Sequence, residues 1–206
     1  MPLPWLLIGA GALLLGGAAV IIFSDPPTEP IPQAKKIAVL GMKESGKTQF
    51  LKTLQNIPYS TYLESTEVEY DEFSVTLPNG KEIKIASGTD LGGAVHFINR
   101  YNRISSGCDA VIFVFDVYKF KNDEDYRLKT RARIEYFRDM SVPNSRKVVI
   151  GSFADKFSSE EDKVKAQDFV YSKIGDIYPE IKAHNFFMKD MRNRDQILYV
   201  CGELFV

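Results

Sequence analysis

The sequence has few of the residues that would hold a soft metal ion or form a redox centre. Its 206 residues include only two cysteines, Cys108 and Cys201, and their spacing matches neither a metal site nor a redox motif. We therefore expect both to be small buried hydrophobic residues in a reducing compartment. The formal net charge of −1 also leaves the chain without a basic excess, so no nucleic-acid partner is expected.

Charge is missing altogether from the N-terminal stretch LPWLLIGAGALLLGGAAVIIF, residues 3–23. A run of ~20 apolar residues is long enough to cross a hydrocarbon core of roughly 30 Å, and Trp5 near one end suits the membrane interface. The pattern predicts one transmembrane helix, with residues 1–23 as a membrane anchor. A cleaved signal peptide is the alternative, although no basic region precedes the apolar run.

Lys and Arg are absent before Lys35. The positive-inside bias therefore predicts a single-pass membrane protein with its N-terminus outside and its C-terminal domain, residues 35–206, in the cytoplasm. Four prolines lie in the stretch between them, residues 24–34. Because proline favours extended polyproline II backbone, this stretch is expected to be a semi-rigid linker.

The sequence that organises the rest of the chain is KKIAVLGMKESGKT, residues 35–48. Residues 37–40 form a short apolar run typical of a buried strand, and residues 41–48 match G-x-x-x-x-G-K-[ST]. The apolar residues in the following stretch, QFLKTLQN, have helical spacing. Strand, glycine loop and helix in this order predict a phosphate-binding loop.

Each part of this loop has an expected role. Gly41 and Gly46 let the backbone approach an anion closely, and the loop N–H groups and helix N-terminus face the α- and β-phosphates. Lys47 is expected against the β- and γ-phosphates, and the Thr48 hydroxyl on Mg²⁺. A glycine turn with a chance lysine is the alternative. The complete expected set is Gly41, Lys43, Glu44, Ser45, Gly46, Lys47, Thr48 and Gln49.

Beyond the loop, strand patterns alternate with helix patterns. An Asn-Gly turn at residues 78–80 joins two alternating runs and predicts a β-hairpin. The whole predicts an α/β domain with a mostly parallel sheet, helices on both faces and one antiparallel edge. Hairpin strands are expected at residues 67–77 and 81–87, further strands at 109–116, 147–153 and 181–188, and helices at 94–106, 123–140, 158–177 and 193–205.

Residues 35–206 resemble a small GTPase of the Ras superfamily, and above all the Arf/Sar branch and the membrane-anchored beta subunit of the signal recognition particle receptor. Besides the glycine loop, Asp90-Leu91-Gly92-Gly93 matches the D-x-x-G motif of that family. The resemblance implies a P-loop NTPase fold that binds GTP or GDP with Mg²⁺. Asp90 would hold Mg²⁺ through water and the Gly93 N–H would bond the γ-phosphate, which makes the following segment a nucleotide-dependent switch.

The resemblance also implies a threonine that completes the Mg²⁺ site. Thr66 has the better spacing, and Thr61 is the alternative. Relatives carry a glutamine where this sequence has Ala94, so intrinsic hydrolysis is expected to be slow or to need a partner. His96 is a candidate substitute, or else a histidine on the face of the switch helix. Lys43 is a candidate cation for the γ-phosphate, or else a solvated loop lysine.

The base-recognition motif N-K-x-D corresponds here to Ser-Phe-Ala-Asp, residues 152–155. Asp155 can accept two hydrogen bonds from the N1 and N2 donors of guanine, and adenine lacks that donor pair. Phe153 replaces the lysine and can stack on the base. The alternative is that Asp155 only caps a loop. For the last family motif, the resemblance implies only backbone contacts from Met188 or Lys189.

These patterns predict a membrane-anchored GTP-binding switch with slow hydrolysis. Mg²⁺-GTP would order residues 57–66 and 90–106 for a protein partner. Tyr59, Tyr62 and Tyr101 are candidate partner contacts, or else pack on the domain itself. One alternative is a nucleotide-binding scaffold or docking subunit of a membrane complex that hydrolyses little or nothing. Another is an ATPase, against which the carboxylate in the base motif argues.

Overall fold

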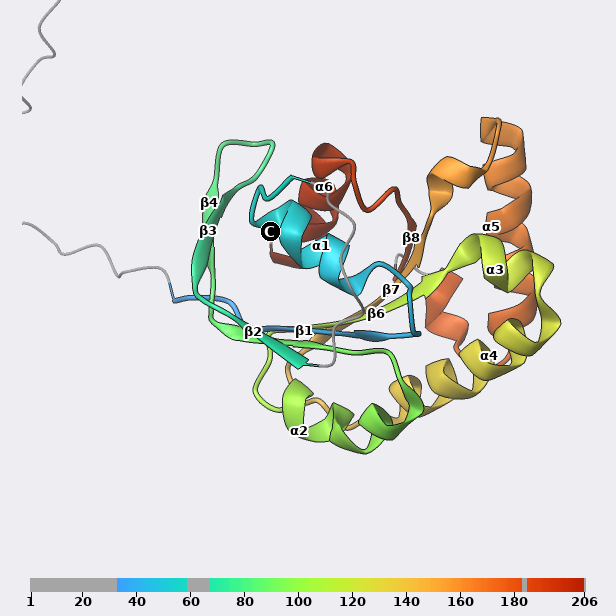
Figure 1. Cartoon of the computed structure of the whole chain (residues 1–206), viewed down its shortest axis with the longest axis horizontal. Coiled ribbons are helices and arrows are strands. Elements are labelled where there is room, and N and C mark those ends of the chain that lie inside the picture. Colours follow the sequence, from blue (N-terminus) through green and yellow to red (C-terminus); the bar gives the residue numbers. More distant parts are fainter. Residues whose placement is uncertain (1–32, 59–66, 183–184, 206) are drawn as a thin grey trace, which may run out of the picture. The chain divides into compact units, whose positions relative to one another are not determined.

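The computed structural model describes residues 33–58, 67–182 and 185–205 (Figure 1). These residues belong to one compact unit that spans residues 32–206. The expected membrane anchor, nearly all of the linker, and the candidate switch residues Thr61 and Thr66 lie outside the described residues. Every helix in the described ranges is too short or too polar to cross a membrane.

A four-stranded parallel sheet lies at the centre of the domain. Every residue of its second strand is buried, as expected where helices cover both faces of a parallel sheet. Phe113 and Phe115 point to one face and Ile112 and Val114 to the other, because successive side chains of a strand alternate. In spatial order the strands are β1 (Ile37–Gly41), β6 (Ala110–Asp116), β7 (Arg146–Ser152) and β8 (Phe186–Met188).

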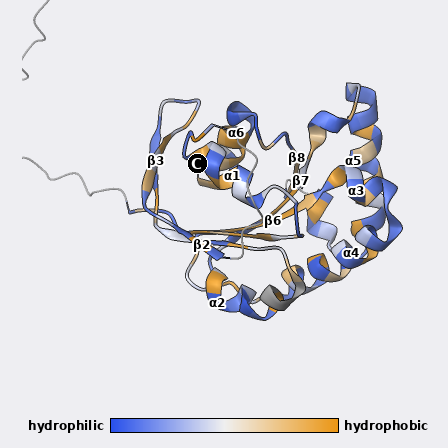
Figure 2. Ribbon diagram, viewed as in Figure 1, coloured by the Kyte–Doolittle hydropathy of each residue, from blue (hydrophilic) through white to orange (hydrophobic). Residues whose placement is uncertain are grey.

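Helices cover both faces of this sheet (Figure 1). Their apolar residues turn toward the strands and their charged residues outward (Figure 2). The mixed α/β architecture with a parallel sheet flanked by helices is therefore as predicted. One face carries α2 (Tyr101–Ser105), α3 (Val117–Asn122), α4 (Glu124–Asp139) and α5 (Glu160–Ile174), and the other carries α1 (Lys47–Leu54) and α6 (Arg194–Phe205).

Local capping explains where the long helices begin. The Asp123 side chain accepts a hydrogen bond from the N–H of Tyr126 at the start of α4. Ser159 accepts one from the N–H of Asp162 at the start of α5. Acidic residues fill both first turns, where the helix dipole favours negative charge.

The hairpin predicted from the Asn-Gly turn is present as two strand pairs. Tyr70 lies opposite Gly88, and Phe73 lies opposite Ile85, so the register continues unbroken across the gap between the pairs. Lys35 beside β1 donates its N–H to Lys84 O, which places the hairpin at the β1 edge. The pairs are β2 (Glu67–Tyr70) with β5 (Gly88–Leu91), and β3 (Phe73–Thr76) with β4 (Glu82–Ile85).

The structure differs from the prediction at three places. The helix expected at residues 94–106 is a 3₁₀ helix, η1 (Val95–Arg100), followed by the short α2. Of the strand expected at residues 181–188, residues 186–188 form β8, whereas residues 181–182 belong to a 3₁₀ turn, η3 (Pro179–Lys182). Short apolar runs do not distinguish a buried turn of helix from a strand, and the buried Ile181 belongs to such a turn.

The third difference is α3, which was not predicted. Asp116 ends β6, and its side chain accepts the N–H of Lys119 as the N-cap of α3. The chain therefore turns directly from the strand into a helix. Val117 and Phe120 of this helix are fully buried.

Candidate functional site

The glycine loop leaves the carboxyl end of β1 and enters α1, as predicted. Gly41 has a φ of 137°, and a Cβ there would lie 2.0 Å from Val114 O of the neighbouring strand. No other residue fits at this close approach. Gly46, with a φ of 86°, is the N-cap of α1. The start and the end of the loop are thus both held in backbone conformations that favour glycine.

Lys47 is buried and points back into the loop. Its Nζ donates to Met42 O at 2.7 Å, and Ser45 Oγ donates to the same carbonyl at 2.9 Å. Glu44 points outward instead, and its carboxylate pairs with Lys119 of α3 at 3.2 Å. The loop therefore encloses one ammonium group, and a phosphate oxygen would be a strong acceptor for its N–H bonds.

Thr48 and Asp90 meet at the start of α1. The Thr48 hydroxyl donates to Asp90 Oδ2 at 2.5 Å. Asp90 is only 4% exposed, and its Oδ1 has no hydrogen-bond partner among the described residues. Burial raises the pKa of Asp90, and the Thr48 hydrogen bond and the charges of Lys47 and Lys52 oppose that shift.

This oxygen set fits the expected Mg²⁺. A hard cation takes carboxylate and hydroxyl oxygens together with water, and a positive charge would relieve the cost of an ionised carboxylate in a buried place. The described part of the chain contains no cluster of three or more His, Cys, Asp or Glu side chains that could hold a metal ion, here or elsewhere, so the protein would supply few of the ligands and water the rest.

Gly93 packs flush against the glycine loop. A Cβ at this position would lie 2.2 Å from the N atom of Lys43 and 2.3 Å from Met42 O. Any side chain here would therefore force the loop or the segment after β5 to move. The structure brings Gly93 to the loop, and the contact of its N–H with a γ-phosphate stays a prediction.

His96 lies on η1, and its side chain is outside what the structure describes.

The predicted base-recognition residues follow β7. The Ser152 hydroxyl is buried and donates to Phe115 O at 2.9 Å. Phe153 has a φ of 61°, which is uncommon for a bulky residue. Lys156 lies over its ring at 4.2 Å from the centroid, and pairs with the buried Asp116 at 3.5 Å. The Phe153 ring is thus held in place from one face.

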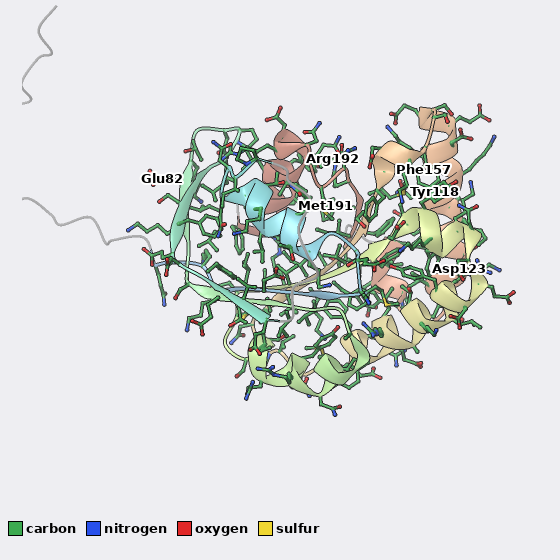
Figure 3. The ribbon with its side chains drawn as sticks, in the orientation of Figure 1. Glu82, Tyr118, Asp123, Phe157, Met191 and Arg192 are labelled. Carbon is green, nitrogen blue, oxygen red and sulfur yellow. The ribbon has the colours of Figure 1, made fainter. Side chains whose placement is uncertain are left out.

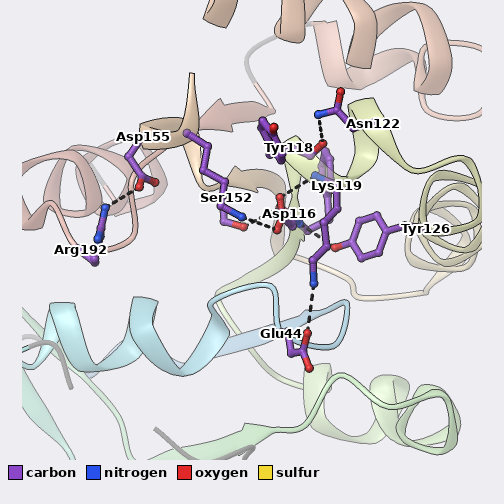
Figure 4. A network of polar contacts seen from close by, with 11 residues as sticks. Glu44, Asp116, Tyr118, Lys119, Asn122, Tyr126, Ser152, Asp155 and Arg192 are labelled. Carbon is purple, nitrogen blue, oxygen red and sulfur yellow. Dashed lines mark hydrogen bonds and ion pairs between the residues drawn. The ribbon is translucent and has the colours of Figure 1, made fainter. Parts of the chain in front are cut away.

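Arg192, in the loop after β8 (Figure 3), contacts the carboxylate of Asp155 (Figure 4). Arg192 Nη2 lies 2.5 Å from Asp155 Oδ2, and the same side chain pairs with Asp190 at 3.3 Å. A guanidinium presents adjacent N–H donors, the same kind of group as guanine N1 and N2. A guanine base would therefore compete with Arg192 for this carboxylate.

At the last family motif, Met188 and Lys189, part of the backbone is already hydrogen-bonded within the protein. The Lys189 N–H donates to Gly151 O at 2.9 Å, and Lys189 O accepts from the N–H of Ala154. Met188 lies opposite Gly151 in the parallel pair of β7 and β8. The Lys189 N–H is therefore occupied within the protein. Burial lowers the pKa of the Lys189 ammonium, whose Nζ lies 4.8 Å from the centroid of the Tyr199 ring.

The side chain of Tyr101 corrects one expectation. It is 1% exposed, so it is not a partner contact. It packs within the domain, and its hydroxyl is hydrogen-bonded to the backbone of Gly41.

Cys201 is buried as expected, whereas Cys108 is half-buried.

Sequence reasoning missed Asp116, Arg133 and Arg192. Asp116 had a usable signal, because it directly follows an apolar strand, and ligand sites gather at the carboxyl ends of parallel strands. In the structure it is 1% exposed, and its N–H donates to the Tyr126 hydroxyl at 2.8 Å. The two arginines carried no local signal.

Comparison with known proteins identifies no family for this chain. No protein-family model matches the sequence, and no curated protein gives a significant match. What the chain does must therefore be inferred from its own residues.

Proposed function

We propose that this chain is a guanine-nucleotide-binding switch protein of the small GTPase type, on a P-loop NTPase fold. The observation that supports it most is the meeting of three segments at the carboxyl end of β1. The glycine loop carries a buried Lys47, the Thr48 hydroxyl bonds Asp90 at 2.5 Å, and Gly93 lies flush against the loop. A phosphate loop, a Mg²⁺ carboxylate and a γ-phosphate sensor need this juxtaposition.

In this proposal the loop N–H groups and the N-terminus of α1 bind the α- and β-phosphates. Lys47 exchanges its bond to Met42 O for the β- and γ-phosphates. Thr48, and Asp90 through water, would hold Mg²⁺, which neutralises negative charge on the phosphate oxygens. Gly93 donates its N–H to the γ-phosphate, so the segment that follows is ordered only by a triphosphate.

Hydrolysis would be slow without a partner. Ala94 offers no side chain that can orient the attacking water, and it is half-buried against the core. We further propose that residues 3–23 anchor the chain in a membrane with the nucleotide-binding domain in the cytoplasm. A protein partner would then read the order of residues 57–66 and 90–106.

A nucleotide-binding scaffold of a membrane complex is the second candidate, and two observations favour it. Ala94 replaces the catalytic glutamine, and Asp155 is already paired with Arg192. In that case the nucleotide would act as a structural ligand, since any ligand that binds only the folded state stabilises it.

The test uses the full chain, purified in a mild detergent without added nucleotide. The protein is denatured, the released nucleotide is identified, and added GTP is then followed over hours. Bound GDP with turnover supports the switch, whereas GTP that persists favours a scaffold or a switch that awaits an activator. A wild-type chain that binds no nucleotide refutes the proposal, and ATP bound as readily as GTP refutes the reading of Asp155.

A further inference from the structure

Arg133 of α4 reaches two backbone carbonyls that belong to different parts of the site. Its Nη1 lies 2.6 Å from Gly93 O and 3.2 Å from Gly41 O. The side chain is only 7% exposed. One guanidinium therefore joins the first residue of the glycine loop to the residue that packs against that loop.

Such an arginine is costly to bury unless acceptors satisfy its donors. Here the acceptors are backbone oxygens at fixed positions, so the arginine in turn restrains the backbone that carries them. Its own position is set by α4, whose Ile134 and Phe137 are fully buried in the core. Gly93 is thus tied to a rigid helix as well as to the loop.

Tyr101 supports the same corner from the loop side, and the Arg133 guanidinium lies beside its hydroxyl. Its hydroxyl lies 3.4 Å from the N atom and 3.2 Å from the O atom of Gly41. Its ring meets Tyr136 of α4 edge-on, with centroids 6.2 Å apart. No contact joins this hydroxyl to Gly93 among the interactions of the described residues, so Tyr101 holds the loop and Arg133 links the loop to Gly93.

We propose that Arg133 is a positioning residue that holds Gly93 against the loop, ready for a third phosphate. This inference rests on the proposed function. A diphosphate offers no phosphate at Gly93, so the hydrogen bond to Gly93 O matters for triphosphate binding alone, whereas the hydrogen bond to Gly41 O restrains the loop for both nucleotides. Arg133 therefore sets the preference of the site for GTP over GDP, although it touches neither nucleotide.

The test measures dissociation constants of GDP and of a non-hydrolysable GTP analogue for the full chain in detergent. Arg133→Met keeps most of the apolar stem and removes the donors. We expect it to lower the ratio of GTP to GDP affinity about tenfold, the loss of one hydrogen bond to a charged group. Tyr101→Phe is the comparison on the loop side: it removes the hydroxyl that bonds Gly41 and keeps the Arg133 donors to Gly93 O, so it should change the ratio less than Arg133→Met does.

Arg131→Met controls for the loss of a charge on the same helix. Arg131 is half-buried and pairs with Asp176, so both affinities should stay at the wild-type value. Thermal unfolding of each variant checks the fold. Where Arg133→Met does not fold, Arg133→Lys replaces it, because a shorter side chain with a point charge cannot reproduce the same geometry.

The outcomes separate the two proposals. A lowered ratio in the folded Arg133 variant supports the positioning role. An unchanged ratio, or equal weakening of both nucleotides, overturns that role and leaves the proposed function intact. A wild-type chain that binds neither nucleotide overturns both together.

Discussion

Removing Arg192 should strengthen the binding of guanine nucleotides. In the structure its guanidinium occupies the carboxylate of Asp155, the group expected to bind guanine N1 and N2. A base that enters must displace this arginine. In Arg192→Ala the carboxylate would be bound by water instead. A guanine base displaces water more easily than it displaces a guanidinium. Guanine nucleotides should gain affinity, and adenine nucleotides should not.

The size of this effect follows from the exposure of the pair. The side chains of Arg192 and Asp155 are 50% and 31% exposed, and exposed ion pairs contribute about 0.2–1 kcal/mol. The expected gain in GDP affinity is therefore about 1.4- to 5-fold. Asp155→Asn should act in the opposite direction. It removes hydrogen bonds to a charged acceptor, each worth about 1.5–3 kcal/mol, and should weaken GDP roughly 10- to 100-fold.

Fluorescent GDP and ADP analogues titrated at two salt concentrations provide the assay. Salt screens the exposed ion pair, so the advantage of Arg192→Ala over wild type should shrink as salt rises. Arg131→Ala breaks another exposed pair, with Asp176, and serves as the control. Weaker GDP binding by Arg192→Ala would refute the reasoning, because Arg192 would then be a ligand of the nucleotide rather than its competitor.

Three further perturbations test the rest of the site. Lys47→Ala should abolish measurable nucleotide binding while circular dichroism stays that of wild type, and unchanged affinity would remove the phosphate-loop assignment. Gly93→Ala should cost about 1–3 kcal/mol of unfolding free energy in a denaturant titration, because its Cβ would lie 2.2 Å from the Lys43 N atom; a cost near zero would mean that this contact is loose. Burial raises the pKa of the Asp90 carboxyl above its usual 3.8, so the native state binds this proton more tightly than the unfolded state. The free energy of unfolding therefore falls as the pH rises from the unfolded-state pKa through the native-state pKa of this carboxyl. At pH 7 without Mg²⁺, Asp90→Asn should therefore raise Tm and lose the Mg²⁺ dependence of nucleotide binding; a lower Tm would contradict this.

Local signals were sufficient for the framework of the domain. The apolar run before Gly41 and the Asn-Gly turn at residues 78–80 each act within a few residues of chain. Each therefore predicted its element correctly. Prediction failed where apolar runs were short, at η1, α3 and residues 181–182, because a turn of helix and a strand bury such runs equally well.

The contacts that tie the site together depend on the tertiary structure. Arg192 meets Asp155 across 37 residues of sequence, and Thr48 meets Asp90 across 42. Parallel strands end at one edge of the sheet, and this shared edge brings distant loops together. A sequence shows which residues end each strand, but not which of their side chains will meet.

Arg133 illustrates the same limit on a helix. It is one of several arginines in α4, and its near neighbour Arg131 is half-buried and paired with Asp176. The chain alone indicated a glycine loop, which depends on residue type and short spacing, and its resemblance to a GTPase family implied the expected roles of Asp90 and Asp155. Which arginine turns inward to Gly41 and Gly93, and which one occupies Asp155, was decided by how the helices and loops pack. Burial and long-range acceptors are properties of that packing and leave no local pattern.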